Sequence, residues 1–121
     1  MLRHVNNAVY QNYFDSGRFR YFKDVLKVDK FKDNNFFVIA SIQIDYIQPI
    51  ELNDKITVET KIIRTGNKSL TMLQQIILHR DETSFISTRS SSVLVSYDIV
   101  QNKSIQVPKD WVEKIEAYEN H

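Results

Sequence analysis

The amino-terminal part of the chain carries a helical pattern of apolar side chains. Between His4 and Leu26 they recur every three or four residues, the spacing that places side chains on one face of an α-helix. A helix of roughly twenty residues is about 30 Å long, which suits the central element of a small domain. The predicted stripe runs through Val5, Val9, Tyr13, Gly17, Tyr21 and Val25, with Tyr10, Phe14 and Phe22 beside it.

Three residues of this predicted helix bear on packing and chemistry. Asn6 and Asn7 are good capping residues, so the helix is expected to start there, with its first amides and positive dipole end available to an anion or a polarised carbonyl. Gly17 costs a helix interior about 1 kcal/mol relative to Ala. It either marks a close approach to another backbone, such as a sheet wrapped around the helix, or is a tolerated glycine.

After residue 35 the pattern changes to alternation and to residues that favour β-strands. Turn residues at 52–55, 66–67 and 80–82 separate the segments, and these tight connections predict an antiparallel meander. One long helix and one curved antiparallel sheet predict an α+β domain with the sheet curled around the helix. The predicted strands are residues 36–48, 56–64, 69–79 and 83–97, and Pro108 opens a predicted short helix over 109–118.

Composition narrows the class of protein. A chain of 121 residues forms one domain, and its formal net charge of +1 argues against a dedicated nucleic-acid binder. It has no cysteine, which excludes disulfides, thiolate nucleophiles and cysteine-ligated metals. No apolar run is long enough to span a membrane and no signal peptide is visible, so we expect a cytoplasmic protein without membrane attachment.

Three segments resemble one family. The first is His4–Tyr10, HVNNAVY, continued by Tyr13, Phe14 and Arg18; the second is Asp45–Ile50, DYIQPI, followed by Asp54; the third is Gly66–Thr71, GNKSLT. Together they resemble the hotdog-fold acyl-CoA thioesterases, specifically the 4-hydroxybenzoyl-CoA thioesterase-like group, from His4 to about Pro108. The resemblance implies a hotdog fold, an acyl thioester of coenzyme A or acyl carrier protein as substrate, and neither metal nor cofactor. It also implies homodimers formed by edge-to-edge sheet pairing, or homotetramers, with active sites at the subunit interface.

The match departs from the family at its start. Relatives resemble Asp-x-x-Gly-His-Val-Asn-Asn, in which the carboxylate four positions before the His is the nucleophile or general base. Here that position falls immediately before Met1, and Arg3 replaces the Gly. We therefore expect that Met1 is an internal methionine of a longer reading frame, and that the chain lacks a first strand and the catalytic Asp.

The resemblance assigns roles around the helix start. The backbone N–H of Asn7 is the candidate donor to the carbonyl oxygen, with Asn6 beside it; alternatively both are only caps. His4 orients the missing carboxylate or contacts substrate, or is structural. Asp15 is a candidate substitute carboxylate; the alternatives are a solvated charge or an ion pair with Arg18 three residues on.

Substrate binding is expected near the Gly66 turn. Ser69 and Thr71 lie where relatives build the acyl-CoA groove, and Arg64, Lys68 and Arg89 are candidates for coenzyme A phosphates, although exposed cations are often only solvated. The sequence thus predicts an acyl-CoA thioesterase. The alternatives are an acyl-thioester-binding protein without hydrolysis, and a structural oligomer.

Overall fold

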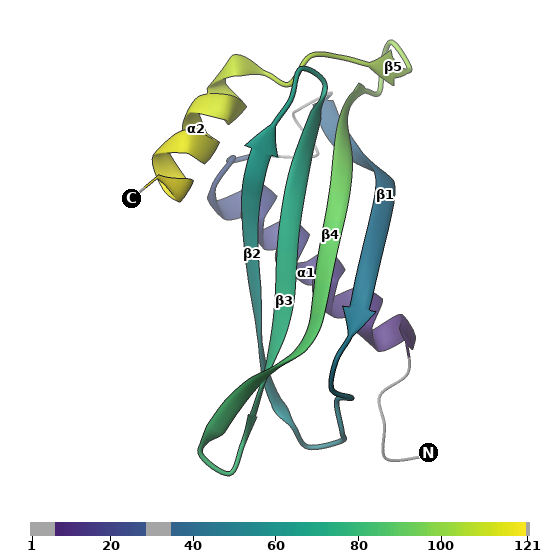
Figure 1. The fold of residues 1–121 in the computed structure, drawn as a ribbon. Helices are drawn as coiled ribbons and strands as arrows, with labels where there is room; N and C mark the ends of the chain where they lie inside the picture. The colour runs from purple at the N-terminus through teal and green to yellow at the C-terminus, as the bar shows by residue number, and fades with distance from the viewer. Residues whose placement is uncertain (1–6, 29–34, 121) are drawn as a thin grey trace.

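The computed structural model describes residues 7–28 and 35–120, and in it one long helix lies along one face of an antiparallel sheet (Figure 1). A second helix, near the carboxyl terminus, packs against the end of the long helix and against one edge of the sheet. The elements are α1 (Asn7–Asp24), β1 (Asn35–Tyr46), β2 (Lys55–Thr65), β3 (Ser69–Arg80), β4 (Thr83–Asp98), β5 (Lys103–Ser104) and α2 (Lys109–Glu119).

The predicted elements are confirmed, with small differences at their ends. The helical pattern of residues 4–26 corresponds to α1, which begins at Asn7, within the expected start, and ends at Asp24; residues 4–6 lie outside the described residues. The first predicted strand ends at Tyr46 rather than residue 48. A short strand that the pattern did not predict, β5, follows the fourth predicted strand and pairs with β4.

The predicted meander is wrong for the first strand. The order across the sheet is β1-β4-β3-β2, so β2, β3 and β4 form a meander while β1 pairs with β4 at the far edge. The connection at residues 47–54 therefore carries the chain from one edge of the sheet to the other. Turn residues show where a chain reverses, but they do not determine which strand it joins.

Hydrogen bonds fix this crossing connection to the end of the sheet and to α1. The amides of Ile47 and Gln48 donate to the Ser87 carbonyl at 2.8 and 3.0 Å. The Ile50 amide donates to the Tyr10 hydroxyl at 2.9 Å, which ties the connection to the first turn of α1.

A partly buried ion pair closes the connection. Nε of Arg80 donates to the Asp54 carboxylate at 2.7 Å, and a terminal nitrogen of the same guanidinium donates at 2.6 Å. The Glu51 amide donates to the same carboxylate at 2.7 Å. The hydrogen bonds from Arg80 hold the pKa of Asp54 below its usual range.

The face that α1 buries differs from the predicted stripe. Its buried residues are Tyr10, Phe14, Arg18 and Tyr21, whereas Val9 and Tyr13 of the predicted stripe are only partly buried. The buried face is thus rotated from the predicted stripe toward Tyr10 and Phe14, which the sequence placed beside it. A charged residue, Arg18, occupies a central buried position.

That charge belongs to a polar seam, which we define as Asp15, Arg18, Thr60 and Gln74. Arg18 donates to Oε1 of Gln74 at 2.9 Å and forms an ion pair with Asp15. Nε2 of Gln74 donates to the Phe14 carbonyl at 2.9 Å and to the Thr60 hydroxyl at 3.1 Å. A buried charge is tolerated only where such partners compensate for lost hydration.

The seam divides the apolar core into two clusters. One lies toward the start of α1 and consists of Tyr10, Phe14, Ile50, Ile76 and Leu78. The other lies toward its end and beneath α2, and consists of Tyr21, Leu26, Ile62, Leu70, Met72, Leu94, Val107, Trp111 and Ile115.

Gly17 lies where α1 crosses the seam. A Cβ atom at this position would be 2.7 Å from Nε2 of Gln74, 2.7 Å from the Thr60 hydroxyl and 3.0 Å from Val58. The sheet does approach the helix closely at Gly17, as one of the two explanations from the sequence predicted, but the contacting atoms belong to side chains rather than to a backbone.

Hydrogen bonds connect the last turn of α2 to α1 and to β2. The Glu119 carboxylate accepts from the Tyr21 hydroxyl at 2.6 Å and from the Ile62 amide of β2 at 2.9 Å. Burial and this neighbouring carboxylate raise the pKa of Tyr21 above its usual value, so its hydroxyl stays a donor.

Substituting Gly17→Ala should lower the free energy of unfolding by about 1–2 kcal/mol, because displacement of the Gln74 amide outweighs the gain in helix propensity. Urea denaturation measures the change. Ser16→Ala, at the exposed neighbouring position, should leave stability unchanged or slightly higher. Equal behaviour of the two variants would contradict the close approach.

The Asp54 carboxylate should contribute stability at neutral pH. Because its pKa is lowered in the folded state, this contribution is present above about pH 4 and is lost as the pH falls through the folded value. Asp54→Asn should therefore be less stable than wild type at neutral pH, and should lose less stability than wild type between about pH 5 and about pH 2. Asp110→Asn, at an exposed carboxylate paired with Lys114 at 3.4 Å, is the control and should lower stability at neutral pH by less than Asp54→Asn does.

Candidate functional site

The first residue of α1 is exposed in the described part of the chain. This residue is Asn7, and the first helical turn contains no acidic side chain. The N–H of a first helical residue has no partner within the helix, and the dipole adds positive potential there. His4 and Asn6, the neighbouring predicted residues, lie outside the described residues.

Tyr10 anchors this helix start to the sheet. Its side chain is buried, its hydroxyl accepts from the Ile50 amide, and its ring packs edge-on against Tyr46 with centroids 5.1 Å apart. Tyr46 is the last residue of β1, so the start of α1 is held beside the end of β1. The sequence placed Tyr10 beside the apolar stripe, but its pairing with Tyr46 depends on the strand order.

The edge of β1 that faces away from β4 is uncovered by the described residues (Figure 1). An edge strand with exposed apolar side chains offers unpaired backbone groups and apolar area to a further strand. The start of α1 therefore lies beside an apolar edge. The exposed apolar side chains of β1 are Phe36, Val38, Ile39, Ile42 and Tyr46, and Ile47 follows directly after the strand.

Asp15 lies away from the helix start. It is eight residues beyond Asn7, which corresponds to about 12 Å along a helix axis. Its side chain is exposed and forms the ion pair with Arg18 that the sequence offered as an alternative. This position favours a role as the partner of Arg18.

Four of the five predicted substrate-binding residues lie at the end of the sheet away from the start of α1 (Figure 1). Arg64, Lys68, Ser69 and Thr71 flank the β2–β3 turn, whereas Asn7 lies at the other end of the molecule (Figure 1). One subunit alone therefore does not bring these residues to the helix start.

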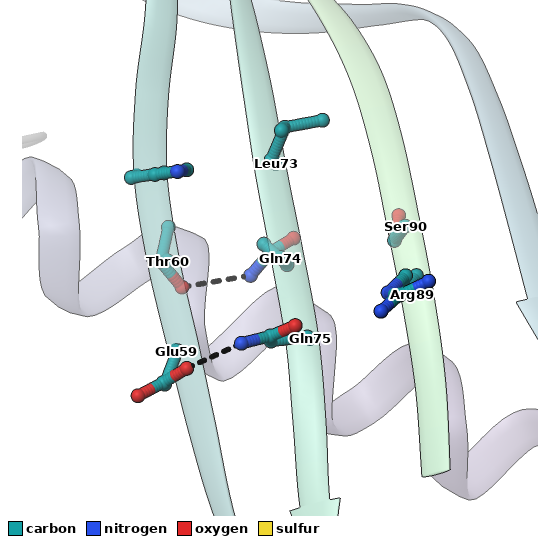
Figure 2. Close-up of a pocket in the computed structure, with 8 residues that line it drawn as sticks. Glu59, Thr60, Leu73, Gln74, Gln75, Arg89 and Ser90 are labelled. Carbon is teal, nitrogen blue, oxygen red and sulfur yellow. Dashed lines mark hydrogen bonds between the residues drawn. The ribbon is translucent and has the colours of Figure 1, made fainter. Parts of the chain in front are cut away.

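Arg89 lies apart from both groups. It projects from the face of the sheet opposite α1 into a shallow pocket of about 420 Å³ (Figure 2). The pocket also contains Glu59, whose carboxylate accepts from Gln75 at 2.5 Å. This pocket is on the other side of the sheet from α1.

Within residues 7–28 and 35–120, no three His, Cys, Asp or Glu side chains are grouped so that they could hold a metal ion. None of the helices described is long and apolar enough to cross a membrane.

Comparison with known proteins gives one family. Residues 1–115 match the thioesterase-like superfamily. A thioesterase from Thermus thermophilus, complexed with coenzyme A and Zn, is 30% identical over 99% of this chain and 84% of that chain, with a TM-score of 0.81. No curated protein matches the chain at a significant level.

Two further structures share the fold at lower identity. The PA5185 protein from Pseudomonas aeruginosa strain PAO1 has a TM-score of 0.85 at 20% identity, covering 97% of this chain and 80% of that one. A mutant 4-hydroxybenzoyl-CoA thioesterase complexed with 4-hydroxybenzoyl-CoA has a TM-score of 0.84 at 17% identity, covering 94% and 87%. These likenesses confirm the predicted hotdog fold, and with the match over residues 1–115 they show that the chain belongs to the thioesterase-like superfamily.

Proposed function

We propose that the protein is an acyl-CoA thioesterase that polarises the thioester carbonyl at the start of α1. The observation that carries the proposal is the exposed first residue of α1, Asn7, at a helix start that Tyr10 holds beside the β1 edge left uncovered by the described residues. The Thermus thermophilus relative binds coenzyme A, which supports this class of substrate.

The reaction needs an attacking oxygen and a donor for the oxygen that becomes negative. Water, or a carboxylate followed by water, adds to the carbonyl carbon; the C–S bond then breaks, and the products are the free acid and the coenzyme A thiol. The Asn7 N–H is proposed to donate to the developing oxyanion, and Asn6 and His4 to stand beside it. The base is proposed to be a carboxylate at the position that the resemblance indicates, four residues before His4. Asp15, which is paired with Arg18 about 12 Å along the helix from Asn7, is the less suitable candidate.

A homodimer formed through β1 would complete the site. Antiparallel pairing of two β1 strands about a two-fold axis places the Asn35 end of β1 in one subunit beside the Tyr46 end of β1 in the other. The β2–β3 turn of one subunit, with Arg64 and Lys68, then lies at the same end of the dimer as the partner's α1 start, with β3 and β4 between this turn and the joined edges. The two cations and the hydroxyls of Ser69 and Thr71 are proposed to meet coenzyme A there.

Substituting Asn7→Pro should lower kcat by about 100-fold or more, because loss of one oxyanion donor has effects of this size. Proline is well tolerated at a first helical position, so the fold should persist. Asn7→Ala is the matched control: it keeps the amide and should stay within a few-fold of wild type. Release of free thiol from a panel of acyl-CoAs measures both.

The same panel separates hydrolysis from binding alone. Wild-type protein that binds acyl-CoA by calorimetry but releases no thiol would support the non-hydrolytic alternative. Equal activity of Asn7→Pro and wild type would remove the helix start from the mechanism.

The double variant Val38→Lys/Ile42→Lys should be monomeric and inactive, because lysines along an edge strand oppose strand pairing. The two side chains are 41% and 38% exposed, so the subunit fold should persist, as circular dichroism would show. Light scattering after size exclusion gives the mass. Ile63→Lys, on the opposite edge strand β2, is the control and should remain dimeric; an active monomer would refute the shared site.

A further inference from the structure

The turn at residues 98–102, between β4 and β5, presents two apolar side chains to solvent. Ile99 is 55% exposed and Val100 is 72% exposed. The turn is nevertheless well bonded: Oδ1 of Asp98 accepts from the Val100 amide at 2.8 Å, and the Asn102 amide donates to the Asp98 carbonyl at 2.8 Å. Its backbone therefore displays Ile99 and Val100 in a fixed arrangement.

This turn and the start of α1 lie at opposite ends of the same free edge. Asp98 pairs with Asn35 at one end of β1, and Tyr46 at the other end contacts Tyr10 (Figure 1). A strand of this length spans about 40 Å, so the turn does not reach the helix start of its own subunit.

We propose that Ile99 and Val100 of one subunit line the acyl-binding wall of the partner's thioester site. This inference rests on the proposed function and its dimer. Antiparallel pairing of the β1 edges places the 98–102 turn of one subunit beside the end of β1 in the other, where Tyr46 contacts Tyr10. There Tyr46 and Ile47, 50% and 53% exposed, are the apolar surface that the turn covers.

The apolar character of Ile99 and Val100 indicates which part of the substrate they would contact. Coenzyme A carries charged phosphates, so two apolar side chains next to the thioester carbonyl suit the acyl group instead. The site is therefore expected to prefer acyl groups with an aliphatic or aromatic body over acyl groups that end in a second carboxylate.

Cross-linking tests the placement, since the native chain contains no cysteine. Val100→Cys combined with Ile47→Cys should give a covalent dimer on a non-reducing gel after mild oxidation, because a disulfide needs Cα atoms within about 7 Å. Val100→Cys alone, and Val100→Cys with Ile63→Cys on the opposite edge strand, are the controls and should stay uncross-linked.

Mixing two variants tests the function of the turn. Val100→Asp should lower kcat/KM for aliphatic acyl-CoAs by about ten-fold or more. Exchange of its subunits with Asn7→Pro subunits should restore about a quarter of wild-type activity, since half the dimers are mixed and each has one intact site. A turn that serves its own subunit would give no recovery.

The outcomes separate the inference from the function it rests on. A dimer without the Val100–Ile47 cross-link, a monomeric wild type, or a Val100→Asp variant with wild-type kcat/KM overturns the inference. Of these, the first and the third leave the thioesterase proposal standing. Wild-type protein that hydrolyses no acyl-CoA overturns the proposed function and with it the acyl-binding role, even when the cross-link forms.

Discussion

The close approach of α1 to β2 and β3 at Gly17 determines where the rest of the structure can lie. A side chain at this position would collide with Gln74 and Thr60, two members of the polar seam. Gln74 in turn bonds the Phe14 carbonyl and Arg18, so the helix is fixed both along its axis and about it. Buried polar groups with every partner in place specify one arrangement, because a shifted helix would leave them unsatisfied.

This fixed helix gives the candidate site its geometry. Once the seam is set, the apolar cluster on its amino-terminal side carries Tyr10 to Tyr46 and to the Ile50 amide. The first amides of α1 are thus supported by rigid elements, which is what preorganised donors require. Within the described residues of one subunit the β1 edge has no further strand beside it, and the proposed dimer would explain why that edge is apolar.

The sequence predicted the elements well and their relations less well. Helical spacing and alternation identified α1 and the strands, and Asn7 was placed at the helix start. The buried face was misjudged because Arg18, a charged residue, occupies a core position that depends on Gln74, 56 residues away. The pairing of β1 with β4 was missed because local turn chemistry contains no information on partner strands. The separation of Arg64 and Lys68 from Asn7 depends on the direction in which α1 runs across the sheet, which local patterns do not reveal (Figure 1).

A crystal structure with a non-hydrolysable acyl-CoA analogue tests the central claim most directly. The account predicts the analogue's carbonyl oxygen about 3 Å from the Asn7 amide nitrogen, at the junction of two subunits joined along β1. An analogue bound elsewhere, such as the Arg89 pocket on the opposite face of the sheet, with the start of α1 covered by protein, would contradict it.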